Sequence, residues 1–358
     1  MTGEPAHPLD LAALADHMAA HLDGVTPPLT ARQFAGGMSN PTFELTDAAG
    51  RRFVLRKKPP GDLLPSAHAV DREFRIMSAL KGGDVPVADP LVLCMDDAVI
   101  GQAFYIMAHV DGRVFRELEL PGMAASERAA IYDAMNDTLA KLHRVDWRAA
   151  GLVGFGRPEN FVARQIAVWR EGGYAQRQVK RWTAQYQASA TDDLDAMNRL
   201  IDWLPENLPE HAETTIAHGD FRLENMIFHP TEPRVLAVVD WELSTLGDPL
   251  ADLAYNCLPW HMPDARRGDL RANDPAQTGI PAEADYLAAY ARRTGRADTG
   301  DWTFYLVLSL FRLGAIAQGV YKRGLDGNAT SSAALQRRDV CRNLSDIAWA
   351  LITAAGRD

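Results

Sequence analysis

Short runs of β-branched and aromatic residues, separated by turn residues, occur repeatedly up to residue 107. Runs bounded in this way are typical of strands. Leucine and methionine at helical spacing predict an amphipathic helix at 10–22, with Asp10 at its N-cap, and a second helix is predicted at 69–80. We therefore expect an antiparallel five-stranded sheet with one packed helix, its strands at 32–34, 42–46, 53–56, 87–93 and 103–107.

From residue 114 onward the apolar positions recur at helical spacing. Long closing helices are predicted at 302–322 and 334–353. The change of period predicts an α+β chain with an N-terminal sheet lobe at 1–108, a hinge at 109–113 and a larger, mostly helical lobe at 114–358. The clearest helical faces carry Ile131, Met135, Leu139 and Leu142, and Leu194, Met197, Ile201 and Leu204.

A group of short apolar runs interrupts the helical half around a polar loop. The runs at 215–217, 226–228 and 235–239 predict strands, and they place Asp220, Asn225 and Asp240 in or next to the connecting turns. Phosphoryl transfer needs one carboxylate that orients an attacking hydroxyl, and further oxygen ligands that hold magnesium against a nucleotide triphosphate. We therefore predict a small-molecule kinase in which these three residues converge on one cleft.

Asp220 is the predicted catalytic base. It would accept a hydrogen bond from the acceptor hydroxyl and take its proton as the bond to phosphorus forms. The alternative is a loop aspartate that caps backbone N–H groups, and the spacing to Asn225 and Asp240 favours the base. His218 is either a general base or a brace for the loop; we include it among the catalytic residues and favour bracing.

Asp240 follows an apolar run, so its carboxylate needs a partner when it is buried. Carboxylate and amide oxygens suit magnesium, and Asp240 and Asn225 are the predicted ligands. Glu242 has two open roles, contact with the metal or acceptor and a solvated or ion-paired position.

The nucleotide site is predicted upstream of the polar loop. Gly36, Gly37 and Ser39 lie between two predicted strands, where their turn either covers phosphates or is an ordinary hairpin turn. Arg56 ends a strand at the place for a phosphate-binding cation, and Glu73 on the next helix could hold it by an ion pair. The order of these features before the polar loop favours a nucleotide site.

Composition excludes several other classes. The formal net charge of −10 disfavours a nucleic-acid partner, and three cysteines without a C-x-x-C pair favour a reducing compartment. The apolar run at 304–311 stops at Arg312, short of a membrane span, and no leader precedes the first helix. The glycines at 154–156 lack the third glycine of a dinucleotide fingerprint, and neither G-x-S-x-G nor a Walker A motif occurs. We expect a cytoplasmic protein with a small-molecule acceptor and no membrane partner; its oligomeric state stays open.

The motifs H-G-D-x-x-x-x-N at 218–225, D-W-E at 240–242 and G-D-P-x-x-D-L-A at 247–254 together resemble the aminoglycoside phosphotransferase and choline kinase superfamily. The resemblance implies a two-lobed protein-kinase-like fold with ATP and Mg²⁺ as cofactors. Protein kinases have an arginine where Gly219 stands, and no activation segment fits after Asp240, so the resemblance implies a small-molecule acceptor. It also implies structural roles for Asp248, as a helix cap, and Asp252, as a brace for the catalytic loop.

Within the superfamily the chain most resembles the kinase-like domain of acyl-CoA dehydrogenase family members ten and eleven and its stand-alone bacterial relatives. The resemblance covers almost the whole chain and implies that Met107, His109 and Val110 form the adenine-binding hinge. One departure is Arg56 in place of the phosphate-binding lysine, a planar fork rather than a compact ammonium. The chain has no flavin-dehydrogenase region, so we expect no acyl-CoA dehydrogenase activity despite the family label.

The acceptor is predicted from charge. Basic side chains facing the cleft would favour an anionic acceptor such as a hydroxyacyl-CoA over a polycationic antibiotic, whereas solvated or ion-paired side chains would say nothing about it. An aminoglycoside-type antibiotic kinase and a catalytically silent nucleotide-binding scaffold are the alternatives. The candidate acceptor contacts are Glu242, Arg157, Arg164, Arg312, Tyr321 and Lys322.

Overall fold

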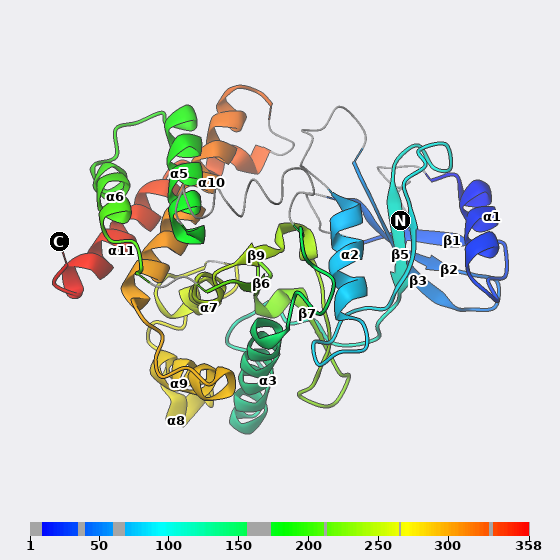
Figure 1. The fold of residues 1–358 in the computed structure, drawn as a ribbon, viewed down its shortest axis with the longest axis horizontal. Helices are drawn as coiled ribbons and strands as arrows, with labels where there is room; N and C mark the ends of the chain where they lie inside the picture. The colour runs from blue at the N-terminus through cyan, green and yellow to red at the C-terminus, as the bar shows by residue number, and fades with distance from the viewer. Residues whose placement is uncertain are drawn as a thin grey trace. The chain divides into compact units, whose positions relative to one another are not determined.

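The chain folds into two compact units, which are described separately here (Figure 1). The first unit comprises Met1–Val114, Trp147–Phe155 and Glu224–Ser244, and the second comprises the three stretches Phe115–Asp146, Gly156–Leu223 and Thr245–Asp358. Two segments of the first unit therefore lie well beyond residue 113, where the sequence analysis ended the sheet lobe and hinge. The structure, a computed structural model, describes residues 9–34, 40–59, 69–155, 173–210, 213–264, 266–328 and 332–357.

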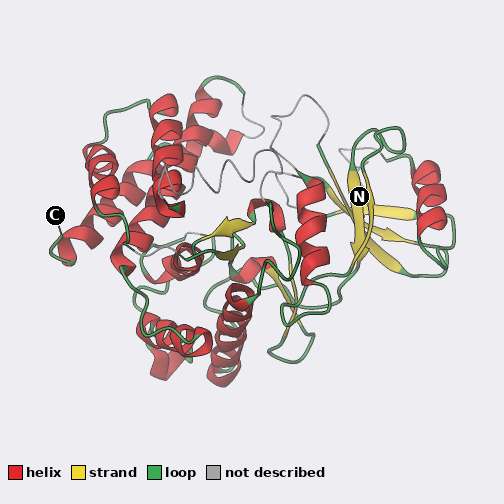
Figure 2. Cartoon of the chain, in the orientation of Figure 1, coloured by secondary structure: helices red, strands yellow, loops and turns green. Residues whose placement is uncertain are grey.

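The first unit is built on a five-stranded antiparallel sheet with the strand order β1-β2-β3-β5-β4. This is the predicted sheet, and Figure 2 shows its strands in yellow. Two helices rather than one pack on it, because α1 contributes Leu14 and Met18 to the same core as Phe43 and Leu55. The bounds are α1 (Leu11–His21), β1 (Thr30–Gln33), β2 (Thr42–Thr46), β3 (Arg52–Lys57), α2 (Val70–Leu80), β4 (Pro90–Cys94), β5 (Phe104–Ala108), β7 (Met226–Phe228), β8 (Val235–Val238) and the 3-10 helix η2 (Trp241–Leu243).

Alternation within the strands explains the sheet. In β2 every second residue is buried, and Phe43 and Leu45 enter the core while their neighbours are partly exposed. At the start of the first helix Asp10 accepts hydrogen bonds from the backbone N–H groups of Ala12 and Ala13, as the predicted N-cap should. The local pattern therefore decided both the strand faces and this helix start.

The β7–β8 hairpin joins the first unit through backbone bridges. Val238 pairs with Val87, and Phe228 pairs with Arg113 next to the predicted hinge. A Cβ atom at Gly112 would lie 2.2 Å from the carbonyl oxygen of Phe228, so only glycine permits this approach. These contacts explain why a hairpin from the middle of the chain belongs to the sheet unit.

The segment at 147–155 belongs to the first unit because α2 holds it. Arg75 donates hydrogen bonds to the carbonyls of Gly151 and Val153, both at 3.1 Å. The guanidinium groups of Arg72 and Arg75 also lie over the ring of Phe155, at 5.3 and 5.9 Å.

The second unit is mostly helical, as predicted, and its core gathers side chains from α5, α6, α10 and α11. The α3 face with Ile131, Met135, Leu139 and Leu142 is buried as the helical spacing predicted. The bounds are α3 (Ala125–Arg144), α5 (Tyr174–Ser189), α6 (Asp195–Glu206), β6 (Thr215–Ala217), β9 (Thr245–Gly247), α7 (Pro249–Cys257), η3 (Leu258–Trp260), α8 (Pro275–Thr278), α9 (Glu283–Thr294), α10 (Trp302–Leu325), η4 (Ser332–Arg337) and α11 (Val340–Ala354); the 3-10 helix η1 (Leu223–Asn225) connects the units along the chain.

The predicted helix at 334–353 is wrong at its beginning. Residues up to Arg337 form the separate 3-10 helix η4, and the regular helix α11 starts at Val340. The sequence analysis also did not identify β9, whose three residues pair with β6. A strand of three residues is too short to show a period, and its partner decides its conformation.

Helix α10 begins where the sequence predicted and runs over 24 residues, three beyond the predicted end at residue 322. Arg312 ends the apolar run at 304–311 but lies inside the helix, as the predicted bounds required. In the described part of the chain α10 alone is long and apolar enough to cross a membrane, yet 72% of that apolar window is buried within the structure. Such burial is what a central core helix shows.

Candidate functional site

The polar loop of the second unit follows β6 and is held by a carboxylate from α7. Asp252 accepts hydrogen bonds from the backbone N–H groups of His218 at 2.7 Å and Gly219 at 2.9 Å. Burial alone would raise the pKa of Asp252, but the hydrogen bond and charge of His143, with the contribution of His218, lower it below its ordinary value. Gly219 has a φ of 81°, a conformation that glycine adopts freely. Asp252 therefore braces the loop, as the resemblance implied.

Asp220 lies within this braced loop with both carboxylate oxygens in contact. The Tyr255 hydroxyl donates to Oδ1 at 2.6 Å, and Arg222 Nη2 lies 3.3 Å from Oδ2. The backbone N–H of Asp220 donates to Nδ1 of His218 at 3.2 Å, and His218 is fully buried. This contact is the bracing role favoured for His218 from the sequence.

Helix α7 is fixed at its start by the residues that the G-D-P motif supplies. Asp248 caps it by accepting the N–H of Leu250 at 2.9 Å, and Pro249 occupies the first turn. The Tyr305 hydroxyl donates to Asp248 Oδ2 at 2.8 Å. Burial raises the pKa of Asp248, although these hydrogen bonds oppose the shift. The predicted cap is confirmed, and it sets the position of Asp252 one turn later.

Arg312 of α10 reaches the same loop. Its Nη2 donates to the carbonyl of Gly219 at 2.8 Å, and its guanidinium lies over the rings of Trp182 and Tyr255 at 5.7 and 5.5 Å. Aromatic faces stabilise a guanidinium in this arrangement. Arg312 thus stabilises the loop beside Asp220, and its contact with an acceptor stays a prediction.

Asn225 and Asp240 belong to the first unit, at one end of the β7–β8 hairpin. The backbone N–H of Val239 donates to the carbonyl of Asn225 at 2.9 Å, which continues the hairpin ladder to this end. Asp240 then adopts a left-handed conformation with φ 67° and ψ 55°. Such backbone strain is uncommon outside glycine and is concentrated at functional positions. It turns the chain from β8 into η2, where Trp241 is buried.

Arg56 of β3 contacts three carboxylates in the first unit. Its side chain lies 3.0 Å from Glu73, 2.7 Å from Asp240 and 3.2 Å from Glu242. The ion pair between Arg56 and Glu73 predicted from the sequence is therefore present. Glu242 is ion-paired, which is one of the two roles left open, and a metal or acceptor contact stays a prediction.

Glu73 is almost fully buried and accepts two further hydrogen bonds. Asn40 Nδ2 donates at 2.8 Å and the Tyr105 hydroxyl donates at 3.1 Å. Burial raises the pKa of Glu73 to about 7; Arg56 and Asn40 oppose this shift, while Asp240 and Glu242 add to it. The cluster thus concentrates negative charge around a single guanidinium.

The predicted ligands in the first unit suit a magnesium ion by type, although the described residues contain no group of three or more histidine, cysteine or acidic side chains placed to hold a metal ion. Asp240 and Asn225 offer the hard oxygen ligands that Mg²⁺ takes, and Mg²⁺ in such sites is completed by substrate phosphates and water. Three carboxylates share the charge of Arg56, so an added divalent cation would reduce their mutual repulsion. The convergence of Asp220 with Asn225 and Asp240 on one ion stays a prediction.

The remaining predicted residues fall into three groups. Met107 is the fourth residue of β5, and His109 and Val110 follow that strand. On α10, Tyr321 is nearly buried. Lys322 forms an ion pair with Asp326 at 2.5 Å, which is the alternative to an acceptor contact that the sequence left open. Gly36, Gly37, Ser39, Arg157 and Arg164 lie outside the described residues.

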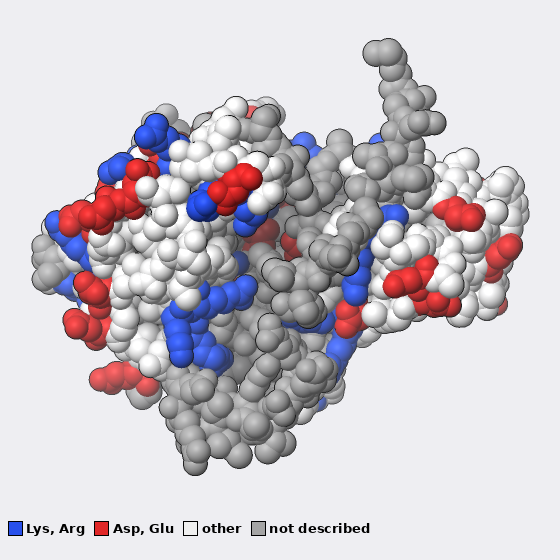
Figure 3. All heavy atoms as spheres, turned by 90° about the horizontal axis from the view of Figure 1, so that it is seen from above, with Lys and Arg blue, Asp and Glu red and all other residues white. Residues whose placement is uncertain are grey.

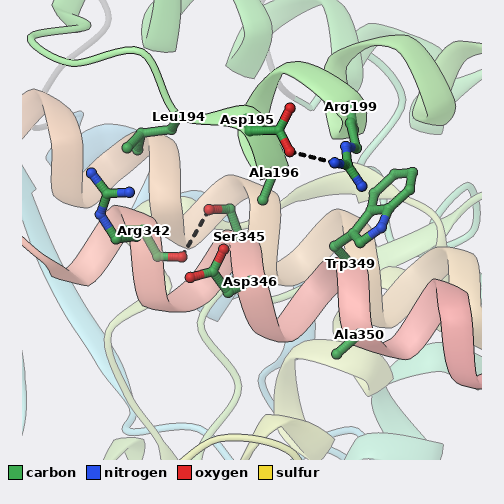
Figure 4. Close-up of a pocket in the computed structure, with 9 residues that line it drawn as sticks. All are labelled: Leu194, Asp195, Ala196, Arg199, Arg342, Ser345, Asp346, Trp349 and Ala350. Carbon is green, nitrogen blue, oxygen red and sulfur yellow. Dashed lines mark hydrogen bonds and ion pairs between the residues drawn. The ribbon is translucent and has the colours of Figure 1, made fainter.

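A groove of about 260 Å³ is also present on the second unit, between α6 and α11 (Figure 4). It is amphipathic, because Arg199 pairs with Asp195 and lies over the Trp349 ring. No predicted site residue lines it. Its lining residues are Leu194, Asp195, Ala196, Arg199, Arg342, Ser345, Asp346, Trp349 and Ala350.

Several residues around the predicted catalytic groups were not identified from the sequence. Tyr255 and Arg222 contact Asp220, while Asn40 and Tyr105 hold Glu73. A sequence signal existed for Tyr255, since it lies three residues after Asp252 and so shares a helical face with it. No comparable local signal marked Tyr105, whose position resembles any other strand residue.

Three comparisons with known proteins agree with this picture. The sequence model of the phosphotransferase enzyme family matches residues 30–303. Acyl-CoA dehydrogenase family member 10 of Mus musculus is 46% identical over 92% of this chain and 30% of its own length. Member 11 of Homo sapiens is 42% identical over 96% of this chain and 43% of its own length. The chain therefore spans less than half of these relatives.

The crystal structure of a Ralstonia eutropha protein, described as a candidate aminoglycoside phosphotransferase, has a TM-score of 0.85 to this chain. The two are 45% identical, and the match covers 97% of this chain and 99% of that one. The kinase-like fold predicted from the motifs, and the resemblance to members ten and eleven, are confirmed.

Proposed function

Because the chain belongs to the phosphotransferase enzyme family, we propose that it transfers the γ-phosphoryl group of ATP, with Mg²⁺, to a hydroxyl of an anionic small molecule. Family membership supports small-molecule kinase activity, and the acceptor is the open part. A hydroxyacyl-CoA is the first candidate, because it combines a hydroxyl with a strongly anionic carrier.

The observation that supports an anionic acceptor is the charge next to Asp220. Arg222 lies 3.3 Å from its carboxylate, and Arg312 contacts the neighbouring carbonyl of Gly219. These two guanidinium groups outnumber the single carboxylate of Asp220, so these three side chains together would repel a polycationic antibiotic and attract phosphate or carboxylate groups. On the face shown in Figure 3, acidic and basic side chains are intermingled, so local rather than overall charge guides this choice.

In the proposed reaction the acceptor oxygen forms a bond to the γ-phosphorus while the bond from that phosphorus to the β,γ-bridging oxygen breaks. ADP leaves, and the hydroxyl proton passes to Asp220. Magnesium would neutralise phosphate charge when bound. Arg56 lies on the strand that precedes the Glu73 helix. Its guanidinium would hold the nucleotide phosphates once these displace its carboxylate partners.

An acceptor panel tests the proposal. Purified protein with Mg²⁺ and ATP is offered hydroxyacyl-CoA thioesters, the free hydroxy acids, choline and kanamycin, and products are identified by mass as gain of one HPO₃ unit. We expect turnover with the thioesters and none with kanamycin. Preferential phosphorylation of kanamycin would favour the antibiotic kinase, and ATP binding without turnover on any acceptor would favour the scaffold.

An Arg222→Gln variant sharpens the same test. Removing this charge should raise KM for the anionic acceptor about tenfold and leave KM for ATP within about twofold, because a charge-assisted contact is worth roughly 1.5–3 kcal/mol. Arg199→Gln, which removes the charge of a more exposed ion pair at the α6–α11 groove, is the control and should change neither constant.

A further inference from the structure

One turn of α7 contacts the polar loop of the second unit through three side chains. Asp252 holds the backbone of His218 and Gly219, Tyr255 holds the carboxylate of Asp220, and Asn256 Nδ2 lies 3.3 Å from the carbonyl of Phe221. These α7 residues are three and four positions apart, so they share one face of the helix. The loop is thus held at four consecutive residues from a single element.

Two of these α7 side chains, Asn256 and Tyr255, are also contacted by residues outside the helix. The Tyr286 hydroxyl donates to Asn256 Oδ1 at 2.6 Å, which orients the amide toward the loop. The Arg312 guanidinium lies over the Tyr255 ring. Burial, followed by the charge of Asp220, raises the pKa of Tyr255, so its hydroxyl keeps its proton and remains a donor.

We infer that Tyr255 is a positioning residue for the base: its hydroxyl on Oδ1, together with Arg222 at Oδ2, fixes the orientation in which the Asp220 carboxylate meets the acceptor hydroxyl. This inference rests on the proposed function of Asp220. The terminal torsion of an aspartate side chain is broad and permits rotation of the carboxylate. A hydrogen bond of 2.6 Å to Oδ1 removes that freedom.

Orientation matters more here than base strength. In phosphoryl transfer the acceptor proton moves late, and positioning supplies much of the rate enhancement. A neutral donor on Oδ1 makes the carboxylate a slightly weaker base, but it aligns the carboxylate without adding a charge. Asp252 and Asn256 place the loop backbone, and Tyr255 places the reacting group itself.

The test compares Tyr255→Phe with Tyr305→Phe. Both substitutions remove a tyrosine hydroxyl that donates to an aspartate carboxylate at or next to α7, and both keep the ring. We expect Tyr255→Phe to lower kcat by about tenfold to hundredfold with KM for ATP within twofold. Tyr305→Phe should leave kcat within about twofold while lowering the melting temperature as much as Tyr255→Phe does.

Equal losses of kcat in the two variants would overturn the inference, as would a Tyr255→Phe effect confined to KM. Crystal structures of both variants provide a readout that needs no acceptor. The Asp220 carboxylate should rotate or occupy more than one orientation only in Tyr255→Phe, and an unchanged single orientation would refute the role. If the wild-type protein phosphorylates no acceptor, the proposed function is wrong. The crystal structures would still show whether Tyr255 positions the Asp220 carboxylate.

Discussion

Asp220 in the second unit and Asp240 in the first are both predicted to act on the same reaction, yet they are held differently. Asp220 accepts a hydrogen bond from the neutral hydroxyl of Tyr255, and its backbone is held by His218. Asp240 has a left-handed backbone, and its carboxylate contacts Arg56, whose charge is shared with Glu73 and Glu242. Asp220 thus combines a neutral hydroxyl donor with a single arginine at 3.3 Å, whereas the arginine that contacts Asp240 is shared with two other carboxylates.

The difference matches the chemistry that each would perform. A base must present one oxygen at a defined angle, and neutral donors set an angle without adding another charge. Ligands of a divalent cation instead need accumulated negative charge, which is costly to bury until a cation arrives. The predictions below test this contrast, in order of expected effect.

Asp220→Asn should have the largest effect. The amide keeps the shape but cannot accept the proton, so kcat should fall by about 10²- to 10⁴-fold, while ATP affinity measured by calorimetry stays near the wild-type value. Asp248→Asn is the matched control, because asparagine caps a helix as well as aspartate does. A loss below tenfold in Asp220→Asn would show that this carboxylate is not the base.

Asp240→Asn should act on the metal. Asparagine tolerates the left-handed backbone at this position, so the fold should be retained. The Mg²⁺ concentration for half-maximal nucleotide binding should rise about a hundredfold, because replacing a ligand should cost at least as much as replacing its supporting partners. Glu242→Gln tests the role left open for that residue. If Glu242→Gln leaves the Mg²⁺ requirement unchanged, Glu242 has a purely ion-paired role. If Asp240→Asn leaves it unchanged, Asp240 is not a metal ligand.

Asp252→Ala should destabilise the second unit. It leaves the N–H groups of His218 and Gly219 buried without an acceptor, at a cost of about 1–3 kcal/mol each. Chemical denaturation should therefore show a loss of about 2–6 kcal/mol. The exposed Asp269→Ala, whose partner is Arg271 two residues away, should change stability by less than about 1 kcal/mol. Equal effects would mean that Asp252 does not brace the loop.

Glu73→Gln should change how stability depends on pH. The ordinary pKa of 4.5 rises to about 7 in the folded protein, so between these values the folded state keeps a proton that the unfolded state has lost. The contribution of Glu73 is therefore fully present below pH 4.5, falls by up to about 1.4 kcal/mol per pH unit as pH rises, and is lost above pH 7. Plots of unfolding free energy against pH should therefore differ in slope between wild type and variant from pH 4.5 to pH 7. Parallel plots would contradict the raised pKa of Glu73, whose main cause is burial.

Much of the fold was predictable because its signals are local. Alternation identified the sheet strands, helical spacing identified α3 and α10, and the G-D-P motif identified the start of α7. The motif spacing also predicted Asp220, Asn225 and Asp240 as the functional residues. Where the prediction failed, local signals were weak: β9 is three residues long, and η4 interrupts the pattern predicted for one helix.

The sequence by itself determined the family motifs and the spacing of the side chains predicted to act in phosphoryl transfer, because residue types and spacings are properties of the chain alone. Only the tertiary structure decided what surrounds them. Tyr255 meets Asp220 across 35 positions, and Arg56 meets Asp240 across 184. Such partners are selected by packing and by the need to satisfy buried polar groups, and no period or motif within the chain encodes that choice.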